Sequence, residues 1–200
     1  MLCIRGASLR ALAVSLAPML TLLALLEACA TPARSPADRA YTGRFTVTTA
    51  SAEQRESVSG RFALEIRGQQ QLLELSSPLG TTVARIEIEP SGARATGAQM
   101  QEVRGADADA LTEQLLGWPL PVSGLADWIE GRPVPSRAAR VEREGGRVVL
   151  LEQDGWTIRL PEYFELLGAA ERPRRLVLER PAGANSPSVV LRLIVDEPAV

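Results

Sequence analysis

Few residues in this 200-residue chain could carry out chemistry, and their spacing favours no common active site. The chain contains no histidine, which removes the most common general base and the most common metal ligand. No nucleophile elbow, phosphate-binding loop or dinucleotide-binding glycine pattern occurs. Glu87 and Glu89 are a carboxylate pair, but they alternate with apolar residues and are expected on the solvent side of a strand. We therefore expect no enzymatic activity, no metal and no bound cofactor. A hydrolase that uses only Asp, Glu and Arg is an alternative.

The first residues are typical of an export signal. Arg5 and Arg10 precede an apolar run over residues 11–26. A membrane-spanning helix needs about 20 apolar residues, and Pro18 interrupts this shorter run. A permanent membrane span is therefore the less favoured alternative.

Cys29 directly follows the apolar run and is placed for covalent modification. The sequence Leu26-Glu27-Ala28-Cys29 resembles the lipobox of bacterial lipoproteins, in which the cysteine is acylated and becomes the new N-terminus; Glu27 departs from the usual small or uncharged residue. The only other cysteine, Cys3, lies in the segment that would be removed, so the mature chain would contain no disulfide. We predict a signal peptide over residues 1–28 and a covalent lipid on Cys29, a diacylglycerol plus an N-acyl chain, which is enough for stable anchoring.

Composition and charge indicate one domain after a short tether. Residues 29–40 contain Pro32 and Pro36 and show no apolar period, as expected of an extended tether. The net charge of −2 gives no electrostatic footprint for nucleic acid. The remaining residues, 41–200, suit a single domain with a substantial core.

Alternation of apolar and polar residues predicts about eleven strands with one buried face. The segment 57–67 is an example, with Val58, Phe62, Leu64 and Ile66 alternating with polar residues. Gly145-Gly146 and Asp154-Gly155 are strong signals for two-residue hairpin turns. The same alternation places further side chains on the buried face: Phe45, Val47, Leu73, Leu75, Ile86 and Ile88.

Two helices are expected to interrupt the strands. The first has Ala108, Leu111 and Leu115 on one face and ends at Gly117. The second is expected to begin with Ser123 as its N-cap and to place Leu125, Trp128 and Ile129 on one face. An extended link over residues 118–122 joins them.

The expected fold is mainly β with α. A flat sheet of so many antiparallel strands would expose its edges, and curling into a barrel-like form avoids this. The outer face is polar, so residues 107–131, which hold both helices, are expected inside or across the mouth of the curved sheet as a lid or plug. The residues alone leave two alternatives open: a filled core, or an apolar gap of the kind an acyl chain would need.

The segment Ser77-Pro78-Leu79-Gly80 suits a type I turn, because proline is pre-set at the second position and glycine is favoured at the fourth. Leu79 would then point into solvent. One exposed leucine is ordinary on a protein surface, so the turn alone assigns it no role.

Several motifs follow one another along the chain: the repeated Gly-Arg-Phe at 43–45 and 60–62, the segment ending in Ser-Pro-Leu-Gly at 77–80, and the segments 113–133 and 154–163. Their order resembles the LolB family of outer-membrane lipoproteins. The combination of the turn with the Pro-Leu-Pro-Val and Trp-Ile motifs in 113–133 is the most specific part. With Cys29, these motifs cover most of the mature chain.

The resemblance implies an eleven-stranded antiparallel half-barrel that encloses short helices and a hydrophobic cavity. It also implies a monomeric receptor, lipid-anchored at the periplasmic face of the outer membrane, that accepts lipoproteins from the periplasmic carrier LolA and inserts them into that membrane. Its partners would be LolA, the acyl chains of the cargo and outer-membrane lipid, which Leu79 would enter as a membrane-insertion loop. Strand parity and helix face predict the residues lining the acyl cavity: Phe45, Val47, Phe62, Leu64, Ile66, Leu73, Leu75, Ile86, Ile88, Leu115, Trp128, Trp156, Ile158 and Leu176.

A second function class stays open at this point. A periplasmic lipoprotein could share the export signal, the anchor and the curved sheet, yet bind another apolar ligand or brace an envelope complex. Acceptance of cargo from a loaded carrier would separate the two.

Overall fold

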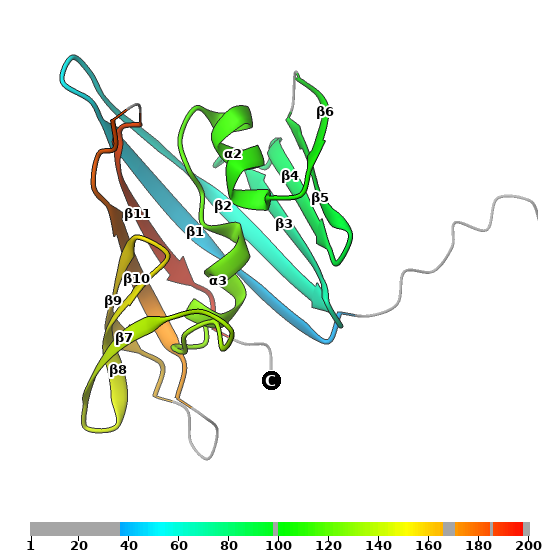
Figure 1. Ribbon diagram of the computed structural model, residues 1–200. Coiled ribbons are helices and arrows are strands. Elements are labelled where there is room, and N and C mark those ends of the chain that lie inside the picture. The colour runs from blue at the N-terminus through cyan, green and yellow to red at the C-terminus, as the bar shows by residue number, and fades with distance from the viewer. Residues whose placement is uncertain (1–36, 98–99, 166–170, 185, 198–200) are drawn as a thin grey trace, which may run out of the picture. The chain divides into compact units, whose positions relative to one another are not determined.

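Eleven antiparallel strands form one sheet in the computed structural model, which describes residues 37–97, 100–165, 171–184 and 186–197 (Figure 1). The strands are β1 (Arg39–Ala50), β2 (Arg55–Arg67), β3 (Gln70–Ser76), β4 (Thr82–Glu89), β5 (Gly92–Gly97), β6 (Met100–Gly105), β7 (Ala139–Glu144), β8 (Arg147–Gln153), β9 (Trp156–Tyr163), β10 (Pro173–Arg180) and β11 (Ser188–Val195). Their order across the sheet is β6-β5-β4-β3-β2-β1-β11-β10-β9-β8-β7, so the first and last strands pair at its middle. Strands β6 and β7 are its open edges.

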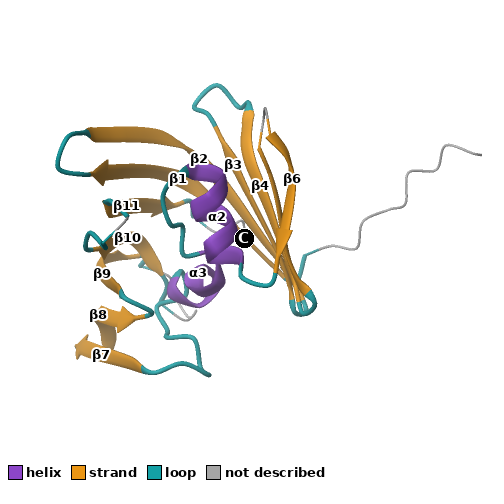
Figure 2. Cartoon of the chain, turned by 45° about the horizontal axis from the view of Figure 1, so that its top comes forward, coloured by secondary structure: helices purple, strands orange, loops and turns teal. Residues whose placement is uncertain are grey.

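The sheet curves around two helices, α2 (Ala108–Leu116) and α3 (Val122–Trp128), as Figure 2 shows. Register shifts interrupt four strand pairs, β3–β4, β5–β6, β7–β8 and β9–β10. Such bulges bend a strand and increase its twist. The predicted placement of the helices within the curve of the sheet is confirmed.

One core joins the concave face of the sheet to the helices. Along β1, Tyr41, Phe45 and Val47 are buried while their neighbours face outward. Buried residues of α2 and α3, including Leu111 and Trp128, belong to the same cluster. The period of two that predicted the strands is therefore also the period of burial. Val58 is an exception: its predicted burial is wrong, because β2 is exposed on both faces over residues 55–59, and Val58 is 52% exposed.

The ends of α2 agree with the sequence. The Asp107 side chain accepts hydrogen bonds from the N–H groups of Asp109 at 2.9 Å and Ala110 at 3.2 Å, which satisfies the first turn. Gly117 ends the helix with a φ of 78°, and its N–H donates to the Glu113 carbonyl. A left-handed residue at this position favours glycine.

The start of α3 differs from the prediction. The helix begins at Val122 with Pro121 as the N-cap, and Ser123 lies inside the first turn. The expected N-cap role of Ser123 is wrong because its hydroxyl donates to the Asp109 carboxylate instead of capping its own helix. A contact between two helices leaves no local signal in the sequence.

Both predicted two-residue turns are confirmed. Gly145 and Gly146 have φ values of 57° and 87°, and Asp154 and Gly155 have values of 53° and 75°. Paired residues flank each turn. Positive φ at both central positions matches the twist of the adjoining strands.

The sheet begins earlier than the predicted boundary at residue 41. The Asp38 N–H donates to the Ile66 carbonyl at 2.8 Å, and β1 starts at Arg39. The last residues of the expected tether, 39–40, are thus part of the domain. Within the described ranges, no helix is both long and apolar enough to cross a membrane.

Candidate functional site

An apolar space lies between the concave face of the sheet and the plug, the name used here for residues 107–131. The plug comprises α2, the linker 117–121 and α3. The sheet contributes two aromatic rings and four leucines, while the linker and α3 contribute the rest. The lining residues are Phe45, Phe62, Leu73, Leu75, Trp118, Leu120, Leu125, Leu191 and Leu193.

The plug fills this space almost completely. The volume open to a water-sized sphere is about 10 Å³. Sites for small molecules usually offer about 300–1,000 Å³, whereas 10 Å³ suffices for roughly one water molecule. An acyl chain can enter here only if the plug moves.

Some of the predicted lining residues border the space and others surround it. Phe45, Phe62, Leu73 and Leu75 line it directly. Ile88 is only partly buried and packs against the core. Acyl binding by these residues stays a prediction. The others lie buried in the surrounding core: Val47, Leu64, Ile66, Ile86, Leu115, Trp128, Trp156, Ile158 and Leu176.

Thr112 holds the linker against α2. Its side chain is fully buried, and its hydroxyl lies 2.8 Å from the Asp109 carbonyl and 3.1 Å from the Leu120 carbonyl. The same hydroxyl accepts the Leu120 N–H at 3.2 Å. These bonds satisfy buried polar groups and hold Leu120 where its side chain reaches the apolar space.

Asp109 joins the two helices of the plug. Its carboxylate accepts the Ser123 N–H at 3.0 Å and the Ser123 hydroxyl at 2.8 Å. Burial raises the pKa of Asp109 above its ordinary value of 3.8, although the bonds from Ser123 oppose this shift. Arg137 continues the network by donating to the Ser123 hydroxyl at 3.0 Å and to Asp154 at 2.7 Å.

Gln153 fastens the end of α3 to β8. It is 4% exposed, and its Oε1 accepts the indole N–H of Trp128 at 2.8 Å and the Val134 N–H at 2.9 Å. Its Nε2 donates to the carbonyls of Val134 at 3.1 Å and Arg137 at 3.2 Å. The amide thus uses both donors and both acceptor positions.

Glu130 fastens the end of the plug to β1. Its Oε1 accepts a hydrogen bond from Arg39 at 2.6 Å and another from the Tyr41 hydroxyl, while Arg132 pairs with Oε2. Burial alone would raise the pKa of Glu130. The hydrogen bonds from Tyr41 and Arg39 outweigh burial and lower the pKa below its ordinary value of 4.5.

The β3–β4 turn holds Leu79 in solvent, with 95% of the residue exposed. The Gly80 N–H donates to the Ser77 carbonyl at 2.9 Å, and the Ser77 hydroxyl accepts the Thr81 N–H at 3.2 Å. Val83, on the same hairpin at the register shift, is 41% exposed. The turn therefore presents an apolar tip, as expected from its sequence.

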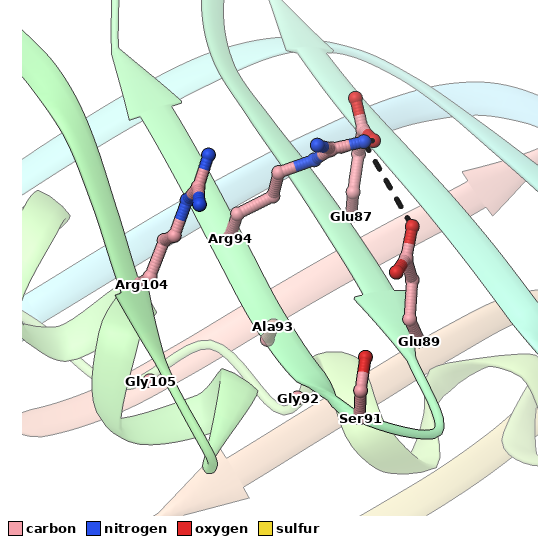
Figure 3. A pocket seen from close by; sticks show the side chains of 8 residues that line it. All are labelled: Glu87, Glu89, Ser91, Gly92, Ala93, Arg94, Arg104 and Gly105. Carbon is pink, nitrogen blue, oxygen red and sulfur yellow. Dashed lines mark hydrogen bonds and ion pairs between the residues drawn. The ribbon is translucent and has the colours of Figure 1, made fainter.

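A charged hollow of about 410 Å³ lies beside the β4–β5 turn and β6 (Figure 3). Arg94 pairs there with Glu87, and it lies 3.8 Å from Glu89. Burial would raise the pKa of Glu87, but Arg94 and Arg85 lower it overall. Both carboxylates are thus in ion pairs on the outer face of the sheet, and the hollow does not suit an apolar ligand.

Cys29, the predicted lipid attachment site, lies outside the described residues. In the part of the chain that the structure describes, no group of three or more Cys, Asp or Glu side chains could hold a metal ion.

Comparison with known proteins identifies the family of the chain. The model of a family described as outer membrane lipoprotein LolB matches residues 38–197. This chain belongs to the LolB family. Outer-membrane lipoprotein LolB of Cupriavidus necator is 40% identical over 181 residues, which cover 86% of this chain and 90% of that protein. LolB of Cupriavidus pinatubonensis is 38% identical over 185 residues, which cover 86% of this chain and 88% of that protein. Membership of the LolB family makes the chain a lipid-anchored outer-membrane lipoprotein.

Among solved structures, a LolA superfamily protein from Nitrosomonas europaea is similar to this LolB-family chain. The match covers 82% of this chain and 86% of that protein, with 12% sequence identity and a TM-score of 0.47.

Sequence reasoning missed five lining residues of this LolB-family domain. Trp118 and Leu120 lie in the link, where no period indicates which side chains are buried. Leu191 and Leu193 lie in a strand with apolar residues on both faces, so alternation does not show which of its side chains face the core. Their pairing with β1 would have assigned them to the buried face, because Leu191 lies opposite Val47 and Leu193 lies opposite Phe45. Leu125 was expected on a helix face but was not assigned to the site.

Proposed function

We propose that this LolB-family chain accepts lipoproteins from the periplasmic carrier LolA and inserts their acyl chains into the outer membrane from its periplasmic side. The chain acts as a receptor and not as an enzyme. It lowers the barrier to transfer by binding the cargo, and it changes no covalent bond.

The observation that carries the proposal is the apolar space under the plug. Its nine lining residues are leucines, phenylalanines and a tryptophan, and none is charged. The plug closes this space against water, so the binding surface is covered when no acyl chain is present. A covered apolar site suits an acyl chain better than it suits a polar ligand.

The energetics of an acyl chain support a direct handover. Each chain of about fifteen methylenes would cost on the order of 12 kcal/mol to expose to water. A continuous apolar path from carrier to receptor to bilayer avoids that cost. Transfer then runs downhill, from a carrier that binds less tightly to a membrane that binds more tightly.

Two further parts of the chain have proposed roles at the membrane. Cys29 carries the lipid that anchors the protein, which intact mass of the mature chain would test; a mass that retains residues 1–28 would contradict it. Leu79 presses its exposed side chain into the headgroup region of the bilayer. Its position on a tight turn, with nothing covering it, supports this role.

The experiment is a two-step transfer assay with the full chain. A labelled lipoprotein bound to LolA is mixed with the purified chain without liposomes, and then with the chain reconstituted in liposomes. We expect the label to pass from LolA to the chain in the first step and into the liposomes in the second, faster than with protein-free liposomes. Retention of the label on LolA in the first step would contradict the proposal.

A further inference from the structure

The arginines of the two Gly-Arg-Phe motifs lie opposite each other on the outer face of the sheet. Arg44 and Arg61 are direct cross-strand partners on β1 and β2, and each is exposed between buried neighbours. Arg192, which is exposed on β11, is the partner of Thr46, the next outward residue along β1 after Arg44. Three arginines from three adjacent strands thus form one group, which we name the arginine cluster.

Carboxylates do not balance the arginine cluster. Like charges directly opposite each other destabilise a sheet. Arg61 makes only a long ion pair, 3.8 Å, with Asp196. Arg44 borders a hollow that also contains Asp196 and Glu162, yet among the described residues the side chains of Arg44 and Arg192 form no ion pair and no hydrogen bond. The cluster therefore leaves positive charge available for an anionic group.

A second pair of opposed arginines shows what the arginine cluster lacks. Arg94 and Arg104 are direct partners on β5 and β6, and both lie at the charged hollow (Figure 3). Arg94 is paired with Glu87, and Arg104 is paired with Glu102. These opposed arginines have carboxylate partners of their own, so they need no external anion.

Hydroxyl groups adjoin the arginine cluster on the same face. Ser76 on β3 is the direct partner of Arg61, and Ser59 on β2 is the direct partner of Thr46. The hydroxyls of Ser59 and Thr46 lie 3.1 Å apart. Guanidinium and hydroxyl donors fit the oxygens of a phosphate group. Six neighbouring outward positions thus hold donors and no carboxylate: Arg44, Thr46, Ser59, Arg61, Ser76 and Arg192.

This donor surface continues into the turn that carries Leu79. Ser76 is the last residue of β3, and the uncharged turn 77–81 follows it directly. Leu79 is 95% exposed, and Val83, at the register shift after the turn, is 41% exposed. An apolar tip beside basic residues suits a bilayer, which offers both an apolar interior and phosphate groups. An acidic protein surface would match the arginines but not the adjoining apolar tip.

We infer that the arginine cluster binds lipid phosphates of the periplasmic leaflet of the outer membrane. The domain then rests on the bilayer through Leu79 and through the outer face of β1, β2 and β11. The inference rests on the proposed function, and it adds to the contact at Leu79 an electrostatic contact that fixes how the domain is turned. The concave face points away from the bilayer in this orientation and stays accessible to a carrier.

Quenching of a fluorophore by lipid headgroups tests this contact without any cargo. The mature chain is reconstituted through its anchor in liposomes of phosphatidylcholine that carry a spin-labelled headgroup lipid and about one quarter phosphatidylglycerol. The fluorophore is attached at Ser57→Cys, the next outward residue after Ser59 along β2, and the proposed lipid on Cys29 leaves no other thiol. We expect quenching there and little quenching at Gln69→Cys, which lies in the turn at the opposite end of β3.

The test variant combines Arg44→Gln with Arg61→Gln, and the matched control combines Arg94→Gln with Arg104→Gln. Each removes two opposed positive charges. An arginine that reaches the phosphates should contribute about fivefold to the ratio of bound to free domain, so the test variant should lower this ratio about 25-fold. The control should keep the wild-type ratio, and about 0.5 M NaCl should weaken binding of the wild type. Thermal denaturation without lipid should show no loss of stability in the test variant, because it removes like charges.

Equal quenching of the test variant and the control would overturn the inference, as would quenching at Gln69→Cys but not at Ser57→Cys. Unchanged quenching of the test variant together with slower acceptance of cargo from LolA would assign the arginine cluster to an acidic protein, which also overturns the inference. Failure of the wild-type chain to pass cargo into liposomes would instead contradict the proposed function. The quenching measurement contains no cargo, so the two failures are distinguishable.

Discussion

The ring of Phe62 lies over Gly43 on the neighbouring strand, where a Cβ on the glycine would come within 2.6 Å of the ring. The two residues are direct cross-strand partners. The relationship is repeated in reverse, because Phe45 is the partner of Gly60 and its ring lies over that glycine. The two Gly-Arg-Phe motifs thus form one reciprocal unit, in which each glycine makes room for an aromatic ring that lines the apolar space.

Gly43→Ala should therefore destabilise the domain. The added methyl group would meet the Phe62 ring and also the Ile194 carbonyl at 2.2 Å, which is backbone and cannot rotate away. Overpacking of this kind costs about 1–3 kcal/mol, which thermal denaturation would measure as a lowered melting temperature.

Gly105→Ala is the matched control for this glycine. The three atoms nearest to its Cβ would all belong to the Leu111 side chain, at 3.3 Å or more, and its backbone needs no positive φ. We expect a smaller loss of stability than for Gly43→Ala. Equal losses would show that the aromatic contact at Gly43 has no special weight.

The sequence predicted the parts of the site that follow a period. Alternation placed Phe45 and Phe62 on the buried face, and helix signals located α2 up to its stop at Gly117. The buried Thr112 and Gln153 could not be found in this way, because each is polar and its partners are distant in sequence or lie in irregular segments. The filling of the apolar space was also unpredictable, since it depends on how closely the linker packs against the sheet.

Glu130→Gln should destabilise the domain in a pH-dependent way. Because the folded pKa of Glu130 lies below 4.5, its carboxylate stabilises the fold above pH 4.5, and this contribution is lost as pH falls through the lowered pKa. The difference in unfolding free energy between wild type and variant should thus be largest near neutral pH and shrink below pH 4.5. Urea denaturation over a pH series measures it.

Tyr41→Phe serves as the control for Glu130, since it removes one hydrogen-bond donor to the carboxylate and leaves the ring in place. It should reproduce part of the loss at neutral pH. The double variant should lose less than the sum of the single variants, because the two groups share one bond. Additive losses, or a gap that stays constant with pH, would contradict the assigned interaction.

Leu120→Ala should lower stability and raise acyl binding together. Leu120 is 3% exposed and reaches the apolar space from the linker, so its truncation enlarges that space. Large-to-small substitutions of this kind cost about 2–5 kcal/mol. A fluorescent fatty acid should nevertheless bind more tightly, because less of the plug has to be displaced.

Leu178→Ala separates the two effects of that substitution. Leu178 is fully buried on β10 but does not line the apolar space. The Leu178→Ala variant should lose a similar amount of stability without binding the fatty acid more tightly. If both variants bound the probe equally, general loosening of the core would explain the gain, and the space under the plug would not be the acyl site.

Leu79→Glu should separate release of cargo from its acceptance. Burial of one leucine in lipid is worth roughly 1.5–3 kcal/mol, far less than an acyl anchor contributes, so Leu79 cannot be what holds the protein to the membrane. Its side chain is 95% exposed and packs on nothing, so the variant should fold and accept cargo as the wild type does. A charged tip cannot insert among the acyl chains at the headgroup boundary without a large cost, so transfer of the labelled lipoprotein from the chain into liposomes should slow. Leu79→Ile should keep the wild-type rate. Insertion by Leu79→Glu at the wild-type rate would return Leu79 to the many exposed leucines that have no role.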